Sequence, residues 1–311
     1  MKFRIAMAAL ATGALAVTAG CGSDSDPDAS APTSAAENTP VVIASQNFPE
    51  AALVSEMYSQ LLAAAGYSPT VKLVATRDAY MADFPGGVDV VPEYVGGIVN
   101  FLNSAKNGAD AEPFTAGDGE ELAADGKSLL DDQGITLLDV SSATDTNAFF
   151  VTTEYAEANG LSTLSDLAGM SVTLAAAPDC EGRLDCAGGL EDSYGIDITE
   201  ILPLGYASDQ TYQSVIDGES QLGETSTTDG TLESLGLMVL EDDMQIQPAQ
   251  NLVPAVSTDF LEANPDLADV LNPLMAALTT EDLTSLNGQI SVDRMTPEEV
   301  ALAYLTDEGL L

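Results

Sequence analysis

The stretch Val41-Val-Ile-Ala-Ser-Gln-Asn-Phe-Pro-Glu50 joins the first predicted strand to the first predicted helix. Val41–Ala44 is a compact apolar run, and residues Ala51–Ala65 carry apolar side chains at helical spacing. Asn47 precedes a Pro and a Glu, an order typical of a helix start, because Pro suits the first turn and an acid favours the positive end of the helix dipole. The stretch therefore predicts a strand followed directly by a helix.

The same alternation of strands and helices continues along the chain. Further strands are predicted at Val71–Val74 and Val88–Val91, and a second unit of this kind starts near Asn147. Such alternation indicates α/β layers with a mainly parallel sheet. The chain then returns to its first unit through the predicted strand Asn251–Val256. Two units joined by two crossovers predict two lobes with a ligand cleft between them, and hinge closure over the ligand.

The N-terminus carries the pattern of an exported lipoprotein. A basic start leads into the apolar run Ile5–Val17, and small residues then precede Cys21. We expect a signal peptide over residues 1–20 and lipidation of Cys21, which would anchor the chain at the outer face of the cytoplasmic membrane. The alternative is an ordinary signal peptide with an incidental Cys. No later run is long enough to span a membrane.

The remaining chain divides into a tether and two lobes. Residues 21–40 are rich in Ser, Asp, Pro and Ala and have no apolar periodicity, so they predict a flexible tether. Residues 41–145 together with 251–311 are expected to form lobe 1. Residues 146–250 are expected to form lobe 2.

The composition is strongly acidic and contains no histidine. The chain has 50 Asp and Glu against 8 Lys and Arg, with a formal net charge of −42. A field of this sign disfavours nucleic acid, but solubility or adaptation to salt also explains it. Without His there is no Ser-His or Cys-His nucleophile pair and no His metal site. We expect no enzyme, cofactor or metal, and keep a cell-surface hydrolase with paired carboxylates as an alternative.

Two cysteines remain after the predicted lipidation site, and they lie close together in Cys180-Glu-Gly-Arg-Leu-Asp-Cys186. In an exported protein such a pair predicts a disulfide. A metal site made only of cysteines would need four of them. We expect Cys180 and Cys186 to form a structural disulfide, with Arg183 organising the loop between them.

Eight short motifs, in order along the chain, resemble those of a known family. They are Ser45–Glu50, Gly87–Gly96, Leu164–Leu167, the Cys180–Cys186 loop with the segments that follow it, Ser226–Gly230, Leu240–Asp243, Asn251–Pro254 and Leu278–Asn287. Together they resemble the glycine betaine/carnitine/choline substrate-binding proteins of ABC transporters. The resemblance implies a type II periplasmic-binding-protein fold, with two α/β lobes and a ligand cleft. It also implies delivery of a compatible solute to a permease and its ATPase subunit.

Aromatic residues are the expected partners of a quaternary ammonium group, which donates no hydrogen bonds and is attracted to aromatic faces. Tyr94 lies in a Pro-Glu-Tyr motif, where the resemblance implies a ligand-binding tyrosine. Aromatic residues at strand and helix edges also fit a core. With that alternative open, the further candidates are Phe48, Tyr80, Phe149 and Tyr212.

Polar candidates are needed if the solute also carries a carboxylate, which favours Arg, amide or hydroxyl donors. Arg77 is a rare base near strand ends, although it could simply balance charge at the surface. Asp229 could instead cap the helix that follows it. The other polar candidates are Asn47, Asn147 and Thr228. Ser226 stands where relatives with complete aromatic cages often have an aromatic residue, so the cage is expected to be incomplete.

The sequence therefore predicts a monomeric, lipid-anchored, extracytoplasmic solute-binding protein for a quaternary-ammonium compatible solute. Its expected partners are the solute, an ABC permease with its ATPase, and the membrane through the lipid anchor. Two further alternatives stay open. One is a binding protein for another small polar solute, such as a polyamine or an amino acid derivative. The other is a sensory or adhesive lipoprotein on the same fold.

Overall fold

The computed structural model describes residues 38–108 and 111–311. The expected signal peptide, the expected lipidation site Cys21 and most of the expected tether lie outside the described residues. Within the described ranges, no helix has the length and apolar character needed to cross a membrane.

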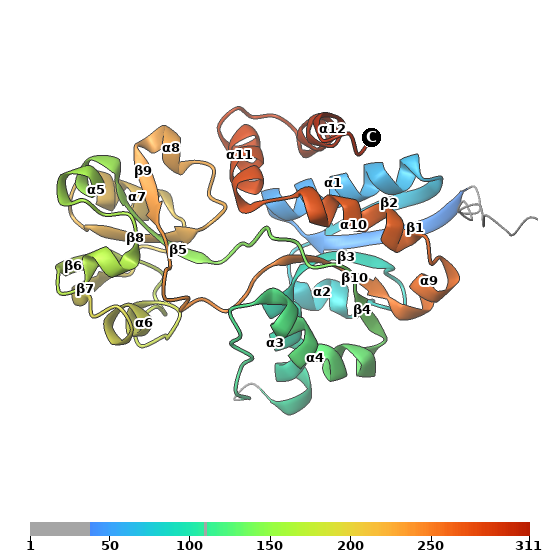
Figure 1. Cartoon of the computed structure of the whole chain (residues 1–311), viewed down its shortest axis with the longest axis horizontal. Coiled ribbons are helices and arrows are strands. Elements are labelled where there is room, and N and C mark those ends of the chain that lie inside the picture. Colours follow the sequence, from blue (N-terminus) through green and yellow to red (C-terminus); the bar gives the residue numbers. More distant parts are fainter. Residues whose placement is uncertain (1–37, 109–110) are drawn as a thin grey trace, which may run out of the picture. The chain divides into compact units, whose positions relative to one another are not determined.

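The first sheet contains five strands. In spatial order they are β2 (Tyr67–Val74), β1 (Thr39–Gln46), β3 (Val90–Tyr94), β10 (Leu252–Ser257) and β4 (Ile135–Leu137) (Figure 1). β1 is parallel to β2 and β3, whereas β10 is antiparallel to β3 and β4. β1 begins at Thr39, two residues before the predicted Val41, so the expected tether ends sooner than residue 40.

The second sheet repeats this arrangement. In spatial order its strands are β7 (Asp197–Leu202), β6 (Ser171–Ala175), β8 (Leu222–Ser226), β5 (Asn147–Thr152) and β9 (Leu237–Leu240). β6 is parallel to β7 and β8, and β5 is antiparallel to β8 and β9. The prediction of a mainly parallel sheet is confirmed, because four strands of each sheet run in the same direction and only the fourth strand in spatial order, β10 or β5, is reversed. In each sheet the fourth strand, β10 or β5, follows a crossover, and strand and helix alternation does not reveal its direction.

Helices cover both faces of the first sheet, and smaller helices flank the second (Figure 1). Those of the first lobe are α1 (Pro49–Ala64), α2 (Arg77–Met81), α3 (Val95–Asn107), α4 (Gly119–Gln133), α9 (Thr258–Ala263), α10 (Leu267–Ala277), α11 (Thr280–Ser291) and α12 (Pro297–Asp307). Those of the second lobe are α5 (Thr153–Asn159), the 3-10 helix Leu164–Leu167, α6 (Ala187–Asp192), α7 (Asp209–Ile216) and α8 (Leu232–Leu235). Apolar side chains of α1, α10, α11 and α12 form one core with β1, and those of α3 and α4 form another.

The start of α1 positions the first site residues. Phe48, not Asn47, is the N-cap residue, and no side chain caps the helix there. Pro49 occupies the first turn with Glu50, as the sequence predicts. Because a helix N-terminus is electropositive, the carboxylate of Glu50 is stabilised at this place.

The two crossovers between the lobes run side by side. Thr144 and Asn251 form an isolated antiparallel bridge. The amide of Asp145 donates to the carbonyl of Gln250 at 3.1 Å, and the amide of Leu252 donates to the carbonyl of Ala143 at 2.9 Å. The predicted lobe boundaries after residues 145 and 250 lie in this paired region and stay predictions. Paired crossovers of this kind suit a hinge.

Candidate functional site

A cavity of about 540 Å³ is lined by residues of both lobes. The first lobe contributes the start of α1 and one side of α11. The second lobe contributes the segment before α7 and the segment after β8, and Asp145 comes from the first crossover. The lining residues are Phe48, Pro49, Glu50, Asp145, Tyr206, Ala207, Tyr212, Ser226, Thr228, Asp229, Gly230, Thr231, Asn287 and Ser291.

Three aromatic side chains from the two lobes line this cavity. Phe48 precedes α1, Tyr212 lies on α7, and Tyr206 follows β7 with 44% of its surface exposed. The hydroxyl of Tyr212 donates to Oδ2 of Asp229 at 2.7 Å, and its ring centroid lies 5.5 Å from that of Phe150. The sequence pointed to Phe48 and Tyr212 but missed Tyr206. Tyr206 lies just past the end of β7, and this position is the signal that could have identified it from the sequence.

Glu50 is buried at the cavity wall and is held from both sides. Its relative exposure is 4%. The hydroxyl of Tyr94 donates to Oε1, and Nδ2 of Asn287 donates to Oε2 at 2.6 Å. The same Nδ2 lies 3.0 Å from the carbonyl of Thr228 in the other lobe. Asn287 thus links a carboxylate of the first lobe to the backbone of the second.

Asp145 is a carboxyl group of the cavity with a raised pKa. Burial, and then the charge of Glu50, raise the pKa of Asp145 to about 7, while the hydroxyls of Thr228 and Ser226 act in the opposite direction. Its Oδ1 atom is buried without a hydrogen-bond partner among the described residues. A buried acceptor of this kind is expected to receive a donor from elsewhere.

Asp229 lies at the cavity wall, close to the start of α8, whose N-cap residue is Thr231; its ligand role stays a prediction. It lines the cavity, and its Oδ1 accepts from the amide of Thr231 at 3.0 Å and from the Thr231 hydroxyl at 2.6 Å. Oδ2 accepts from the hydroxyls of Tyr212 and Thr225. The carboxylate is therefore surrounded by neutral donors and also shapes the turn into α8. Thr228, the other candidate of this segment, is buried and lines the cavity.

Arg77 and Tyr80 lie apart from this cavity, around a buried carboxylate. Nε of Arg77 donates to Oε1 of Glu93 at 2.8 Å, and its NH2 group donates to Oε2 at 3.0 Å. The Tyr80 hydroxyl donates to the same Glu93, which is 1% exposed. An unpaired charge there would be strongly destabilising, which explains why a scarce arginine is placed at this position. Neither residue lines the cavity, and their ligand roles stay predictions.

Four other candidates also lie outside the cavity lining. Tyr94 donates a hydrogen bond to Glu50 at the cavity wall, and Phe149 is buried in the core of the second lobe. Asn47 is exposed at the end of β1. Asn147 lines a neighbouring cavity of about 90 Å³, and its Nδ2 lies 3.3 Å from Oδ2 of Asp185. The ligand roles of these four residues stay predictions as well.

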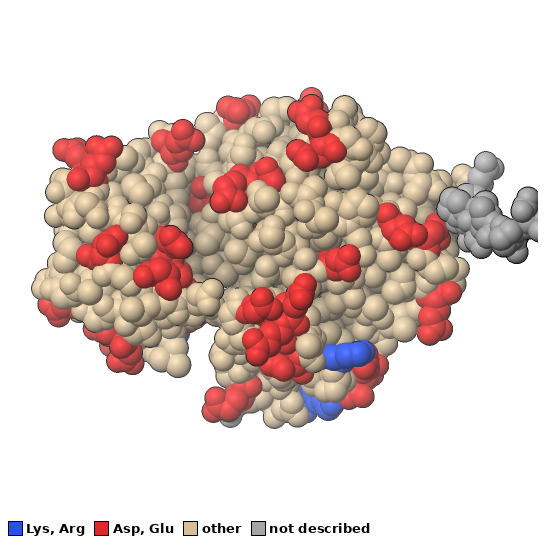
Figure 2. Space-filling view, viewed as in Figure 1, with Lys and Arg blue, Asp and Glu red and all other residues tan. Residues whose placement is uncertain are grey.

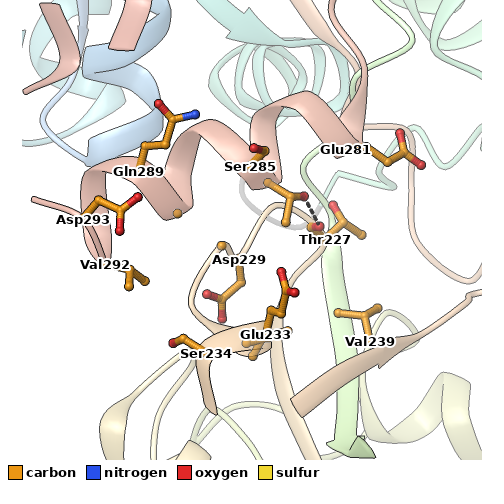
Figure 3. Close-up of a pocket in the computed structure, with 14 residues that line it drawn as sticks. Thr227, Asp229, Glu233, Ser234, Val239, Glu281, Ser285, Gln289, Val292 and Asp293 are labelled. Atoms are coloured by element: carbon orange, nitrogen blue, oxygen red, sulfur yellow. Dashed lines mark hydrogen bonds between the residues drawn. The ribbon is translucent and has the colours of Figure 1, made fainter. Parts of the chain in front are cut away.

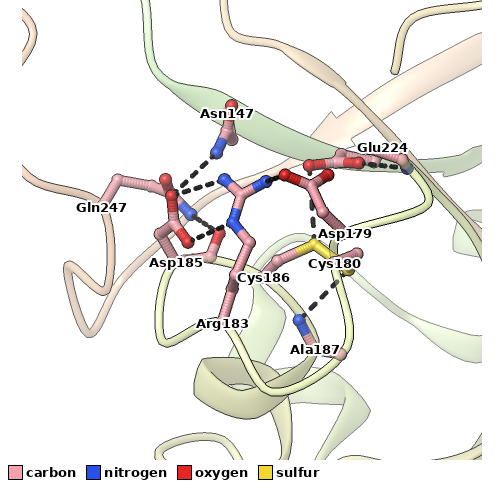
Figure 4. The surroundings of a disulfide bond; sticks show 10 residues. Asn147, Asp179, Cys180, Arg183, Asp185, Cys186, Ala187, Glu224 and Gln247 are labelled. Carbon is pink, nitrogen blue, oxygen red and sulfur yellow. Dashed lines mark hydrogen bonds and ion pairs between the residues drawn. A yellow bond between two sulfur atoms is a disulfide. The ribbon is translucent and has the colours of Figure 1, made fainter. Parts of the chain in front are cut away.

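Cys180 and Cys186 form a disulfide in the second lobe (Figure 4). Arg183, inside the loop, donates to both carboxylate oxygens of Asp185, at 2.9 and 2.7 Å. Nε2 of Gln247 donates to the carbonyl of Asp185 at 2.8 Å and so ties the loop to the second crossover. Both sulfur atoms also lie close to the Glu224 carboxylate, but they are bonded to each other and are not free thiolates for a metal.

A second cavity, of about 790 Å³, lies between α11 and the segment that contains α8 (Figure 3). It shares Asp229 and Gly230 with the first cavity, but its lining contains no aromatic residue from the part of the chain that the structure describes. At its edge the hydroxyl of Thr284 donates to the carbonyl of Thr227 at 3.2 Å. Although this cavity is larger, the first one has the chemistry of a solute site, because aromatic rings and carboxylates meet there.

Comparison with known proteins gives one consistent result. The chain matches the family model of the substrate binding domain of the ABC-type glycine betaine transport system over residues 39–307. It is 27% identical to the glycine-betaine-binding protein of Pseudomonas aeruginosa, over 86% of this chain and 88% of that protein. It is 29% identical to the glycine betaine-binding protein YehZ of Escherichia coli, over 87% of this chain and 91% of that protein.

A solved structure supports the fold. Apo YehZ from Escherichia coli matches with a TM-score of 0.72 at 27% identity, over 88% of this chain and 99% of that one. The two-lobed binding-protein fold predicted from the sequence is therefore confirmed, and so is the family that the motifs resemble.

Proposed function

The chain belongs to the substrate-binding domains of ABC-type glycine betaine transport systems, and from this premise we propose that it captures a quaternary-ammonium solute in the cavity between its lobes. Glycine betaine, choline and carnitine are the leading solutes. The loaded protein would deliver its solute to a permease and the associated ATPase. We further propose that it acts outside the cytoplasm as a monomer, anchored through a lipid on Cys21.

The observation that carries this proposal is the meeting of three aromatic rings from two lobes at one cavity. Phe48 belongs to the first lobe, and Tyr206 and Tyr212 belong to the second. An ammonium group over an aromatic face gains about 0.5 to 2 kcal/mol per ring. Because the rings come from both lobes, a bound ammonium would favour the arrangement in which the lobes are close together.

A solute screen with one aromatic variant tests the proposal. Purified protein is heated with glycine betaine, choline or carnitine, and binding raises the melting temperature, with about 2.7 kcal/mol of stabilisation at a hundredfold excess over Kd. Tyr206→Ala should weaken solute binding about five- to thirtyfold, as expected from the loss of about 1 to 2 kcal/mol. Calorimetric titration measures both Kd values.

The matched control is Tyr155→Ala. Tyr155 is also a partly buried tyrosine of the second lobe, but it lies on α5 and does not line the solute cavity. Its removal should leave Kd unchanged. If no quaternary-ammonium solute raises the melting temperature at millimolar concentration, the proposed solute class is rejected.

A further inference from the structure

Three carboxyl groups line the solute cavity, and no basic side chain among the described residues lines it with them. The acids are Glu50, Asp145 and Asp229. The described bases are Lys72, Arg77, Lys106, Lys127, Arg183 and Arg294. On the face shown in Figure 2, acidic side chains are spread widely and basic ones appear only at the lower right. Negative charge at the cavity therefore has no counterion within the described protein.

Two of the described bases, Arg77 and Arg183, are already paired with carboxylates. Arg77 forms its two hydrogen bonds with Glu93. Arg183 pairs with Asp185 and lies 3.4 Å from a carboxylate oxygen of Asp179. Releasing either one would leave a carboxylate without its cation, which is unfavourable for the buried Glu93 in particular. These arginines are thus poor partners for an anionic group in the cavity.

Neutral donors hold two of the three acids. Glu50 accepts from Tyr94 and Asn287, and Asp229 accepts from hydroxyls and an amide. Hydrogen bonds of this kind stabilise a carboxylate without cancelling its charge. The cavity therefore keeps a negative potential that attracts a cation and repels an anion.

Asp145 adds a free acceptor. Its buried Oδ1 has no hydrogen-bond partner among the described residues, although the side chain lies at the cavity. After a small rotation of the Asp145 side chain toward the cavity, a hydroxyl or N–H group on a solute would satisfy this atom. The carboxylate of a zwitterion would instead face Glu50, Asp145 and Asp229 at short range, and no basic side chain of the described residues lines the cavity to offset the repulsion.

We propose that this cavity selects a solute with net positive charge and a hydrogen-bond donor, of the choline type, over zwitterions that carry a carboxylate. This inference rests on the proposed function and narrows its solute class. The aromatic rings would hold the ammonium group, and Asp145 would accept the donor. Asp145 is then the residue that sets the selectivity between cation and zwitterion.

The test is calorimetric titration of the purified protein at pH 8 and low salt with choline, glycine betaine, carnitine and putrescine. Carnitine and choline both carry a hydroxyl, but only carnitine also carries a carboxylate. Comparing their Kd values therefore measures the effect of the carboxylate on binding. We expect choline to bind at least tenfold more tightly than carnitine or glycine betaine. Asp145→Asn should weaken choline binding at least tenfold and reduce that preference.

Asp125→Asn is the matched control. It removes the same charge from an exposed position on α4 that does not line the cavity, and should change Kd less than twofold. The preference for choline is measured on the unmodified protein and requires no variant. The proposal therefore remains testable even if Asp145→Asn folds poorly, which a large fall in melting temperature would reveal.

The outcomes separate the two proposals. Equal or tighter binding of glycine betaine than choline would overturn the cation selectivity and leave the proposed quaternary-ammonium function standing. An unchanged preference in Asp145→Asn would overturn the role of that residue. Binding of putrescine with no binding of any quaternary-ammonium compound would reject the proposed solute class while supporting selection of a cation.

Discussion

At the scale of single residues, the raised pKa of Asp145 predicts a pH-dependent stability. Burial and the charge of Glu50 raise this pKa to about 7, and Asp229, Tyr94 and Tyr206 also face the group. The folded protein then keeps a proton that the unfolded chain releases above about pH 4. The stabilisation from protonated Asp145 is therefore present below pH 4 and is lost as pH rises through 7.

Asp145→Asn should remove this dependence. The difference in free energy of unfolding between the unmodified protein and the variant should fall by at most about 1.4 kcal/mol per pH unit between pH 4 and 7. Urea unfolding at pH 4, 5, 6, 7 and 8 measures it. Asp125→Asn, which alters an exposed carboxylate, serves as the comparison. A pH-independent difference would mean that Asp145 is not protonated in the folded protein.

Residue-scale sequence reasoning finds side chains at the cavity where a position after a strand suffices, but it does not show contacts with a partner distant in sequence. Phe48, Tyr212, Thr228 and Asp229 were predicted from their places after strands or in matched motifs, and they line the cavity. Arg77 looked available because bases are scarce, but β3 supplies a buried Glu93 as its partner. Nothing in the local sequence shows this pairing.

At the scale of elements, the close contact between α11 and the segment after β8 predicts the effect of Gly230→Ala. A Cβ atom on Gly230 would lie 2.2 Å from the amide nitrogen of Gly288 and 2.4 Å from the carbonyl oxygen of Thr284. Both are backbone atoms of a helix and cannot rotate away. The substitution should push α11 away from the segment that carries Thr228 and Asp229.

We expect Gly230→Ala to lower the free energy of unfolding by about 1 to 3 kcal/mol, as other overpacked sites do, and also to weaken solute binding. Chemical unfolding and calorimetric titration measure the two effects. Gly86→Ala is the control, because a Cβ there would meet only ordinary contacts, the nearest at 3.8 Å. Unchanged stability and affinity in Gly230→Ala would show that α11 can move away from Gly230 at little cost in free energy.

Most elements follow from hydrophobic periodicity, but their order in the sheets does not. β2 ends at Val74, as the strand predicted at Val71–Val74 does, and β10 overlaps the strand predicted at Asn251–Val256. In contrast, β3 begins at Val90 and extends to Tyr94, past the predicted end of the strand at Val91. The local sequence decides whether a strand forms. The places of β5 and β10 in their sheets depend instead on the crossovers through which the chain enters each lobe.

At the scale of the whole molecule, the net charge of −42 predicts that salt stabilises the fold. Self-repulsion of a strongly charged chain disfavours the compact state, and the Debye length falls from about 30 Å at 0.01 M salt to about 3 Å at 1 M. Raising KCl from 0.01 to 0.5 M at pH 7 should raise the melting temperature by several degrees. Sucrose at matched osmolality controls for solute effects other than screening.

The same salt series separates the bulk charge from the charge of the cavity. Glu50 is buried and Asp145 is shielded by its neighbours, and partly buried pairs are screened less than exposed ones. Solute affinity measured across the series should therefore fall only a few-fold while the melting temperature rises. If affinity fell in step with the screening of surface charge, the general acidity of the chain, and not the carboxylates of the cavity, would be what attracts the solute.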